Sequence, residues 1–114
     1  MRVRVISKQD RGSVFSTNSI YYVLAIFLND ESARFYCEID DMDRCLYGAM
    51  LYPSDVEMIS SHISALWVSR RLGKNIILSW PELFEQQYLA DDASAGNAAA
   101  QETIRKLMLL ARRD

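Results

Sequence analysis

The chain has 114 residues, so we expect residues 1–114 to form a single domain with one hydrophobic core. Half of the residues are hydrophobic and 25% are charged, which is typical of a globular protein that needs no disulfide or structural metal. The net charge of −2 argues against a nucleic-acid partner and an anionic membrane surface, because both attract an excess of Lys and Arg.

The first two predicted strands lie within residues 1–28. Residues 2–7 alternate between polar and apolar side chains and predict a strand with Val3 and Val5 inward. Residues 9–19 are polar and predict a loop. Residues 20–28 are β-branched or aromatic on both faces, which favours a central strand covered on both sides. A short buried helix remains the alternative there, because periodicity cannot separate the two at this length.

The next segments continue a meander. Turn-forming residues at 29–32 lead into a strand over 33–39, so residues 20–39 form a hairpin. Residues 40–43 are an acidic turn. Residues 45–52 favour a third meander strand over a helical segment.

Residues 54–72 carry the pattern of an amphipathic helix. Ser54 and Glu57 fit a capping box at its start, and Gly73 fits a left-handed stop. Its main apolar face holds Val56, Ile59, Ile63, Leu66 and Trp67. A second apolar stripe holds Met58, Ala65, Val68 and Leu72. Because a helix on a sheet buries only one face, the second stripe either packs under the later helices or joins two copies through Met58, Val68 and Leu72.

The C-terminal part predicts one short strand and two helices. Residues 75–78 are a strand candidate, and Ser79 to Glu82 fit a second capping box. The helix that follows has one face of Trp80, Leu83, Phe84 and Tyr88. Residues 90–100 read as a solvated loop that runs into a helix over about 97–112. That helix turns Ala100, Ile104, Leu107, Met108 and Ala111 inward. Strands before helices predict an α+β fold, with an antiparallel meander sheet from the N-terminal half packed on helices from the C-terminal half.

Residues able to support catalysis are sparse. The one histidine, His62, has no positioned partner in the sequence, and no nucleophile or nucleotide-binding motif occurs. Cys37 and Cys45 lack the spacing of a metal or redox pair, so we expect two reduced thiols in a cytoplasmic protein. The chain also begins without an apolar signal segment. We therefore expect neither a metal nor a cofactor, and a protein that is not an enzyme.

A dense acidic stretch in the middle of the chain favours a binding function. The candidate partner-binding residues are Asp30, Glu31, Glu38, Asp40, Asp41 and Asp43. Such charge segregation steers a basic partner, although successive turns of a meander lie at opposite ends of a sheet. We expect an immunity-type inhibitor of the bacterial kind, which blocks a basic toxin or nuclease domain with carboxylates in place of phosphates.

Three alternatives remain open at this point. One is a nucleic-acid-associated or regulatory module that uses the basic clusters, which hold Arg70, Arg71, Lys74, Arg105, Lys106, Arg112 and Arg113. A secretion chaperone or adaptor is another. The third is a small enzyme with an Asp or Glu as its acid/base group, which would show as a pocket with carboxylates of raised pKa.

Overall fold

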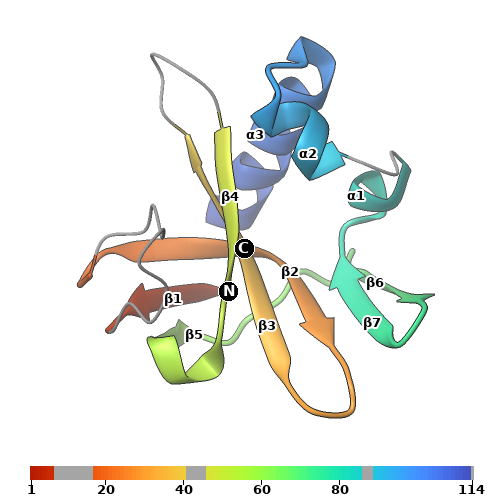
Figure 1. Ribbon diagram of the computed structural model, residues 1–114. Coiled ribbons are helices and arrows are strands. Elements are labelled where there is room, and N and C mark those ends of the chain that lie inside the picture. The colour runs from red at the N-terminus through yellow and green to blue at the C-terminus, as the bar shows by residue number, and fades with distance from the viewer. Residues whose placement is uncertain (7–16, 41–45, 86–88, 114) are drawn as a thin grey trace.

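The computed structural model describes residues 1–6, 17–40, 46–85 and 89–113 (Figure 1). Within them, seven strands form one antiparallel sheet. The strands are β1 (Arg2–Val5), β2 (Ile20–Leu28), β3 (Ala33–Asp40), β4 (Leu46–Leu51), β5 (Val56–Ser60), β6 (Val68–Leu72) and β7 (Asn75–Ser79). The helices are the single 3-10 turn η1 (Pro53–Asp55) and the α-helices α1 (Pro81–Glu85), α2 (Leu89–Ser94) and α3 (Ala98–Arg113). The predicted α+β fold is confirmed, with the N-terminal sheet packed on C-terminal helices.

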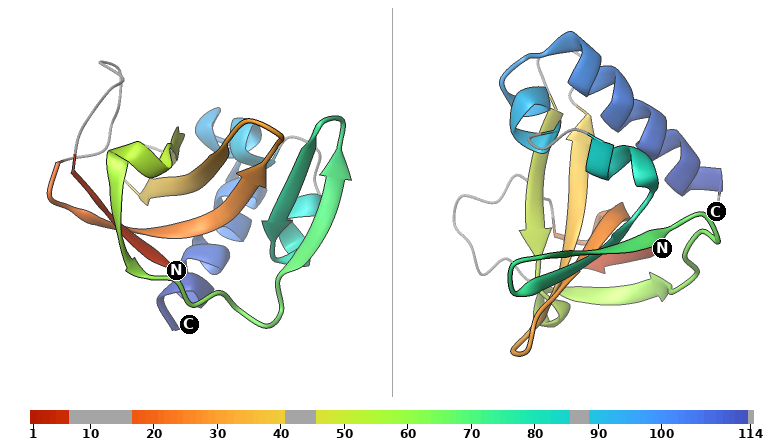
Figure 2. Two further views of the ribbon diagram at one scale, coloured as in Figure 1. Left: turned by 90° about the horizontal axis from the view of Figure 1, so that it is seen from below. Right: turned by 90° about the vertical axis from the view of Figure 1, so that its right-hand side faces the viewer.

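β2 is the centre of the sheet. One of its edges pairs with β3, which in turn pairs with β4. Its other edge is shared, because β1 pairs with residues 20–22 and β7 pairs with residues 25–28. β5 then extends the sheet beyond β1, and β6 extends it beyond β7. Since β1 and β7 diverge from one strand, the sheet is strongly bent (Figure 2).

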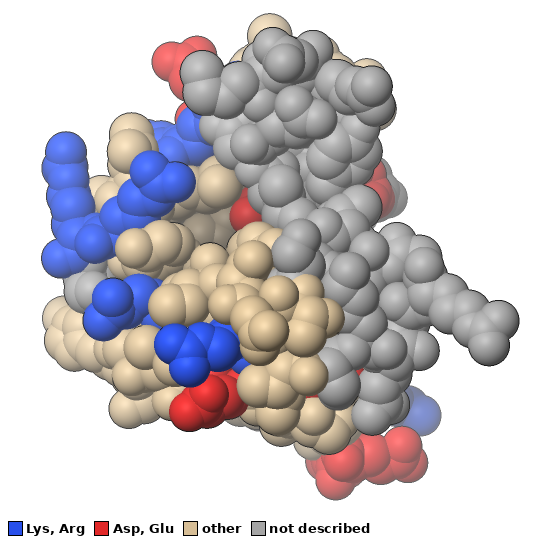
Figure 3. Space-filling view, turned by 90° about the vertical axis from the view of Figure 1, so that its left-hand side faces the viewer, with Lys and Arg blue, Asp and Glu red and all other residues tan. Residues whose placement is uncertain are grey.

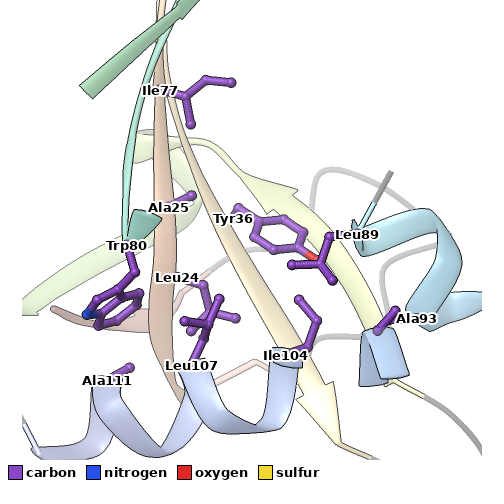
Figure 4. Close-up of a cluster of buried hydrophobic side chains, with 11 residues drawn as sticks. Leu24, Ala25, Tyr36, Ile77, Trp80, Leu89, Ala93, Ile104, Leu107 and Ala111 are labelled. Atoms are coloured by element: carbon purple, nitrogen blue, oxygen red, sulfur yellow. The ribbon is translucent and has the colours of Figure 1, made fainter. Parts of the chain in front are cut away.

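The bent sheet has a hydrophobic cluster on each side. The helix-side cluster contains Leu24, Ala25, Tyr36, Ile77, Trp80, Leu89, Ala93, Ala100, Ile104, Leu107 and Ala111 (Figure 4). The strand-side cluster contains Val3, Val5, Val23, Ile26, Phe35, Cys37, Leu51 and Val56, all of them from strands. β2 and β3 contribute to both clusters, so the expected central strand at residues 20–28 is confirmed as a strand covered on both sides.

A β-bulge in β2 distributes its side chains between the clusters. Val23 pairs with Cys37 and Ala25 pairs with Tyr36, so Leu24 is the extra residue. Val23 faces the strand-side cluster, whereas Leu24 and Ala25 both face the helix-side cluster. The bulge therefore resets the in-and-out alternation of the strand, which a sequence pattern of continuous apolar residues does not reveal.

The predicted helix over residues 54–72 is wrong. η1 ends after Asp55, and Val56 is already extended, with φ −135° and ψ 156°. β5 pairs with β1, and β6 forms a hairpin with β7 in which Gly73, at φ +59°, opens the two-residue turn. Gly73 thus adopts a positive φ as predicted, but it turns a hairpin and does not end a helix.

Two physical reasons explain this difference. The segment is rich in β-branched residues and serines, which are weak helix formers, and its apolar spacing suited a helix only by coincidence. β1 and β7 also each offer a free edge, and pairing with them satisfies the backbone of β5 and β6. The apolar stripe expected to join two copies does not form, because Met58 lies on β5 whereas Val68 and Leu72 lie on β6.

Most of the other predicted elements are confirmed. The strands expected at 2–7, 33–39, 45–52 and 75–78 are β1, β3, β4 and β7. α3 begins where expected, and all of its predicted inward residues belong to or pack against the helix-side cluster. The loop expected over 90–100 is wrong in its first half, because α2 occupies Leu89–Ser94. Most of the loop predicted over 9–19, the turn at 41–43 and Tyr88 lie outside the described residues.

Candidate functional site

Two of the predicted partner-binding acids lie at the tip of the β2–β3 hairpin. Asp30 and Glu31 are exposed in a tight turn, where the Asn29 Oδ1 accepts hydrogen bonds from the Glu31 N–H at 2.9 Å and the Ser32 N–H at 2.8 Å. The Asn29 N–H also donates to the Ser32 carbonyl at 3.1 Å. These three bonds hold the turn in one shape, so both carboxylates project from a preorganised backbone.

The hairpin β6–β7 lies beside this acidic turn. Leu28 at the end of β2 pairs with Ile76 of β7, and the Arg34 Nη2 donates to the Asn75 Oδ1 at 3.3 Å. Leu72 is 58% exposed and Ile76 is 40% exposed at this end of the molecule. We call Asp30, Glu31, Leu72, Lys74 and Ile76 the hairpin-tip surface. Leu72 pairs with Asn75 and Ile76 is the next residue of β7, so the two aliphatic side chains project from opposite faces of the β6–β7 hairpin. Exposed aliphatic side chains with charges nearby are found in protein–protein interfaces.

The remaining predicted acids do not join this surface. Asp40 is the last residue of β3, whereas Glu31 precedes its first residue, so the two lie at opposite ends of the strand (Figure 1). Asp41 and Asp43 fall outside the described residues. The structure therefore supports the expectation that successive turns of the meander separate these acids.

Glu38 is not a surface residue. It is 4% exposed on β3, and the hydroxyl of Tyr36 donates a hydrogen bond to its Oε1. Within the described part of the chain, the Glu38 Oε2 has no hydrogen-bond partner. A carboxyl enclosed in this way offers no area to a macromolecular partner.

Burial shifts the proton affinities of this pair. Desolvation raises the pKa of Glu38 from 4.5 to about 7, against the opposing effect of the Tyr36 hydrogen bond. Burial also raises the pKa of Tyr36 well above its ordinary value, with the nearby Glu38 charge adding to the effect. Tyr36 therefore stays a neutral donor, while Glu38 can gain or lose a proton near neutral pH.

The charge pattern of the sequence groups Glu38 with its acidic neighbours and does not indicate the buried Tyr36–Glu38 pair. The alternation of side chains along a strand does indicate the pair, since Tyr36 and Glu38 are two residues apart and share one face of β3. Phe35 and Cys37 share the opposite face and belong to the strand-side cluster. Tyr36 points toward Leu89 of α2, so the helix covers this side of the strand (Figure 4).

The other candidate residues are distinguished by their burial and their contacts in the fold. Cys37 is a free, fully buried thiol whose pKa is raised to about 12, first of all by desolvation. His62 is exposed between β5 and β6. Asp55 is 6% exposed, and its Oδ2 accepts the Tyr52 N–H at 3.2 Å. Among the residues that the structure describes, no three His, Cys, Asp or Glu side chains are grouped as metal ligands.

Basic residues from the two ends of the chain meet on another part of the surface. The Arg112 guanidinium of α3 lies 5.9 Å from the centre of the Tyr22 ring on β2. Tyr22 in turn pairs with Arg2 on β1. Figure 3 shows Lys and Arg side chains gathered on this side of the molecule. The basic clusters can be seen in the sequence, but their convergence cannot, because residues 2 and 112 come together only in the folded chain.

Comparisons with known proteins give no relative. No family model, no curated protein and no solved structure matches the chain. In the part of the chain that the structure covers, none of the helices has the length and apolar character needed to cross a membrane.

Proposed function

We propose that this protein acts by binding and not by catalysis, as an immunity-type inhibitor that blocks a basic toxin or nuclease domain. The observation that carries this proposal is the hairpin-tip surface. There a hydrogen-bonded turn presents the Asp30 and Glu31 carboxylates next to the β6–β7 hairpin, whose exposed Leu72 and Ile76 side chains project from its two faces.

The chemistry of the tip suits a phosphate-binding site on the partner. Two carboxylates on adjacent residues can occupy positions that arginine and lysine side chains of a nuclease otherwise use for phosphate oxygens. The turn is already ordered by Asn29, so little conformational entropy is lost on binding. Leu72 and Ile76 supply apolar area around the charges, which lengthens the lifetime of the complex.

The proposal places the protein in the bacterial cytoplasm. A free, buried Cys37 thiol is consistent with the reducing conditions of that compartment. An inhibitor acting there protects its own cell from a toxin domain before that domain reaches nucleic acid.

The test begins with an affinity capture from the native host and a kinetic measurement on the recovered partner. The variant Asp30→Asn/Glu31→Gln removes the two carboxylates of the tip. Asp92→Asn/Glu102→Gln is the matched control, because it makes the same change at exposed acids on α2 and α3. We expect the tip variant to associate about tenfold more slowly in low salt, and the control to associate like the wild type.

The aliphatic part of the tip has its own test. Leu72→Ala should raise the dissociation rate, whereas Leu109→Ala on α3 should leave it unchanged, since both residues are more than half exposed in the free protein. Equal binding by the wild type and both tip variants would contradict the proposal. So would a recovered partner whose contact surface is acidic.

A further inference from the structure

The basic residues of β1 and α3 form one surface, which the hairpin-tip surface does not include. Its members are Arg2 and Arg4 of β1 and Arg112 and Arg113 in the last turn of α3, and we call it the basic face. Arg2, Arg112 and Arg113 are exposed, and the Arg4 side chain is 40% exposed. Glu57 neutralises only part of this charge, through its 3.3 Å ion pair with Arg4.

Helix stability alone does not explain the basic face. Arg112 and Arg113 lie in the last turn of α3, where cations interact favourably with the helix dipole. That explanation does not extend to Arg2, which lies on a strand from the other end of the chain. Tyr22 connects the two elements, because it pairs with Arg2 and its ring carries the Arg112 guanidinium.

We propose that the basic face binds the phosphodiester backbone of single-stranded nucleic acid. All four of its cationic side chains are arginines, whose planar guanidinium groups bind phosphate oxygens in pairs. The Arg112 guanidinium lies over the half-buried Tyr22 ring, and bases stack on guanidinium planes as well as on aromatic rings in surfaces that bind single strands. The net charge of −2 argues against a nucleic-acid partner for the molecule as a whole, but phosphates respond to the local field within about a Debye length, and the basic face makes that field positive.

Nucleic acid fits this surface better than an anionic lipid surface does. Membrane-binding helices combine basic residues with a continuous apolar face that enters the bilayer. Among the residues that the structure describes, the exposed aliphatic side chains near the basic face are Ile20 on β2 and Leu109 on α3, which lie on different elements. They do not make a continuous apolar band.

The binding would be separate from the proposed inhibition. The basic face adjoins Ile20 to Tyr22 at the start of β2, whereas the hairpin-tip surface adjoins Leu28 at its end. A nine-residue strand therefore separates the two surfaces, about 25 Å at the usual rise per residue. The two functions can consequently be disabled independently.

Fluorescence anisotropy with a labelled single-stranded oligonucleotide of about 20 nucleotides tests the proposal. The triple variant Arg2→Gln/Arg112→Gln/Arg113→Gln should bind at least about tenfold more weakly at low salt. The dependence of log K on log salt should fall by about two, at ~0.7 for each lost phosphate contact. The control Arg70→Gln/Arg71→Gln removes two charges from the exposed strand β6 of the β6–β7 hairpin and should bind like the wild type.

Three outcomes would overturn the proposal. The first is no binding by the wild type at about 50 mM salt, where phosphate contacts are strongest. The second is an equal loss in the basic-face variant and the hairpin control, which would indicate unspecific attraction. The third is binding to phosphatidylserine vesicles in a flotation assay without binding to the oligonucleotide, which would assign the face to a lipid surface. Circular dichroism of each variant confirms that the fold is retained.

Discussion

At the scale of single residues, one hydroxyl group binds the backbone at the bulge in β2. Leu24 has no partner residue in the β2–β3 register, and the Ser79 hydroxyl donates to its carbonyl oxygen at 2.6 Å. Ser79 is fully buried, so water cannot replace this bond. The hydroxyl thus satisfies a backbone acceptor close to the bulge.

Ser79→Ala should lower the free energy of unfolding by about 1–2 kcal/mol, because the variant removes the hydroxyl donor from a buried carbonyl. Urea denaturation measures the effect. Ser69→Ala on the exposed strand β6 is the control and should change stability by less than about 0.5 kcal/mol. Equal stabilities of the two variants would show that the bulge does not need this hydroxyl.

Glu38 makes the stability of the protein depend on pH. Its pKa rises from 4.5 to about 7 in the folded state, so between these values the folded protein holds a proton that the unfolded chain releases. The stabilisation is therefore complete below pH 4.5 and is lost as the pH rises toward 7. A shift of this size corresponds to about 3 kcal/mol.

Glu38→Gln should remove this pH dependence, since the amide resembles the protonated carboxyl and still accepts the Tyr36 hydrogen bond. We expect the variant to be more stable than the wild type at pH 8 and similar to it at pH 5. Denaturation curves at several pH values provide the measurement. A variant less stable than the wild type at pH 8 would mean that the ionised carboxylate contributes to the fold.

At the scale of elements, the segment from η1 to β6 shows how pairing partners override a helical pattern. Ser54 is exposed within η1 and does not cap a helix. The N-cap position of η1 is occupied by Tyr52. The side chain that matters there is Asp55, which is buried and accepts the Tyr52 N–H. Asp55 thereby sets the direction in which the chain enters β5.

Ser54→Ala and Asp55→Ala distinguish this arrangement from a capped helix. If Ser54 capped a helix, Ser54→Ala would lower the stability by about 1 kcal/mol. Because Ser54 is exposed within η1, we expect the substitution to lower it by less than about 0.5 kcal/mol. Asp55→Ala should cost about 1–3 kcal/mol, because it leaves a backbone donor without its acceptor. Thermal melts of both variants supply the comparison. A larger loss of stability for Ser54→Ala than for Asp55→Ala would instead support a helix capped by Ser54.

At the scale of the whole molecule, the two hydrophobic clusters are joined by shared strands. β2 and β3 contribute buried side chains to both of them. Trp67 packs against both clusters and meets Trp80 in an edge-to-face contact, with ring centres 5.3 Å apart. Neither cluster can lose its packing without disturbing the strands that support the other.

Unfolding should therefore be a single cooperative transition. Tryptophan fluorescence, which reports on the Trp67–Trp80 contact, and far-ultraviolet circular dichroism, which reports on the sheet and helices, should give the same midpoint in urea. Midpoints that differ would show that the clusters unfold separately. The variant Trp80→Phe, which retains much of the buried apolar area, checks whether the fluorescence change depends on this contact.

The sequence alone determined the elements whose local pattern and tertiary surroundings agree. Residues 20–28 predict a strand because they are apolar on both faces, and the structure buries both faces. α3 is predictable because the spacing of Ala100, Ile104 and Leu107 matches the one face that it buries. The exposed acidic turn at Asp30 and Glu31 is likewise a local feature, set by its turn residues.

Only the tertiary structure decided the features that depend on distant partners. Residues 56–60 and 68–72 became strands because β1 and β7 offered free edges, and this pairing outweighed their helical spacing. Glu38 became buried because strand alternation placed it on the covered face of β3 together with Tyr36, which no count of acidic residues reveals. The basic face exists because β1 and α3 meet at Tyr22, and contacts between the two ends of a chain are fixed by packing and not by local sequence.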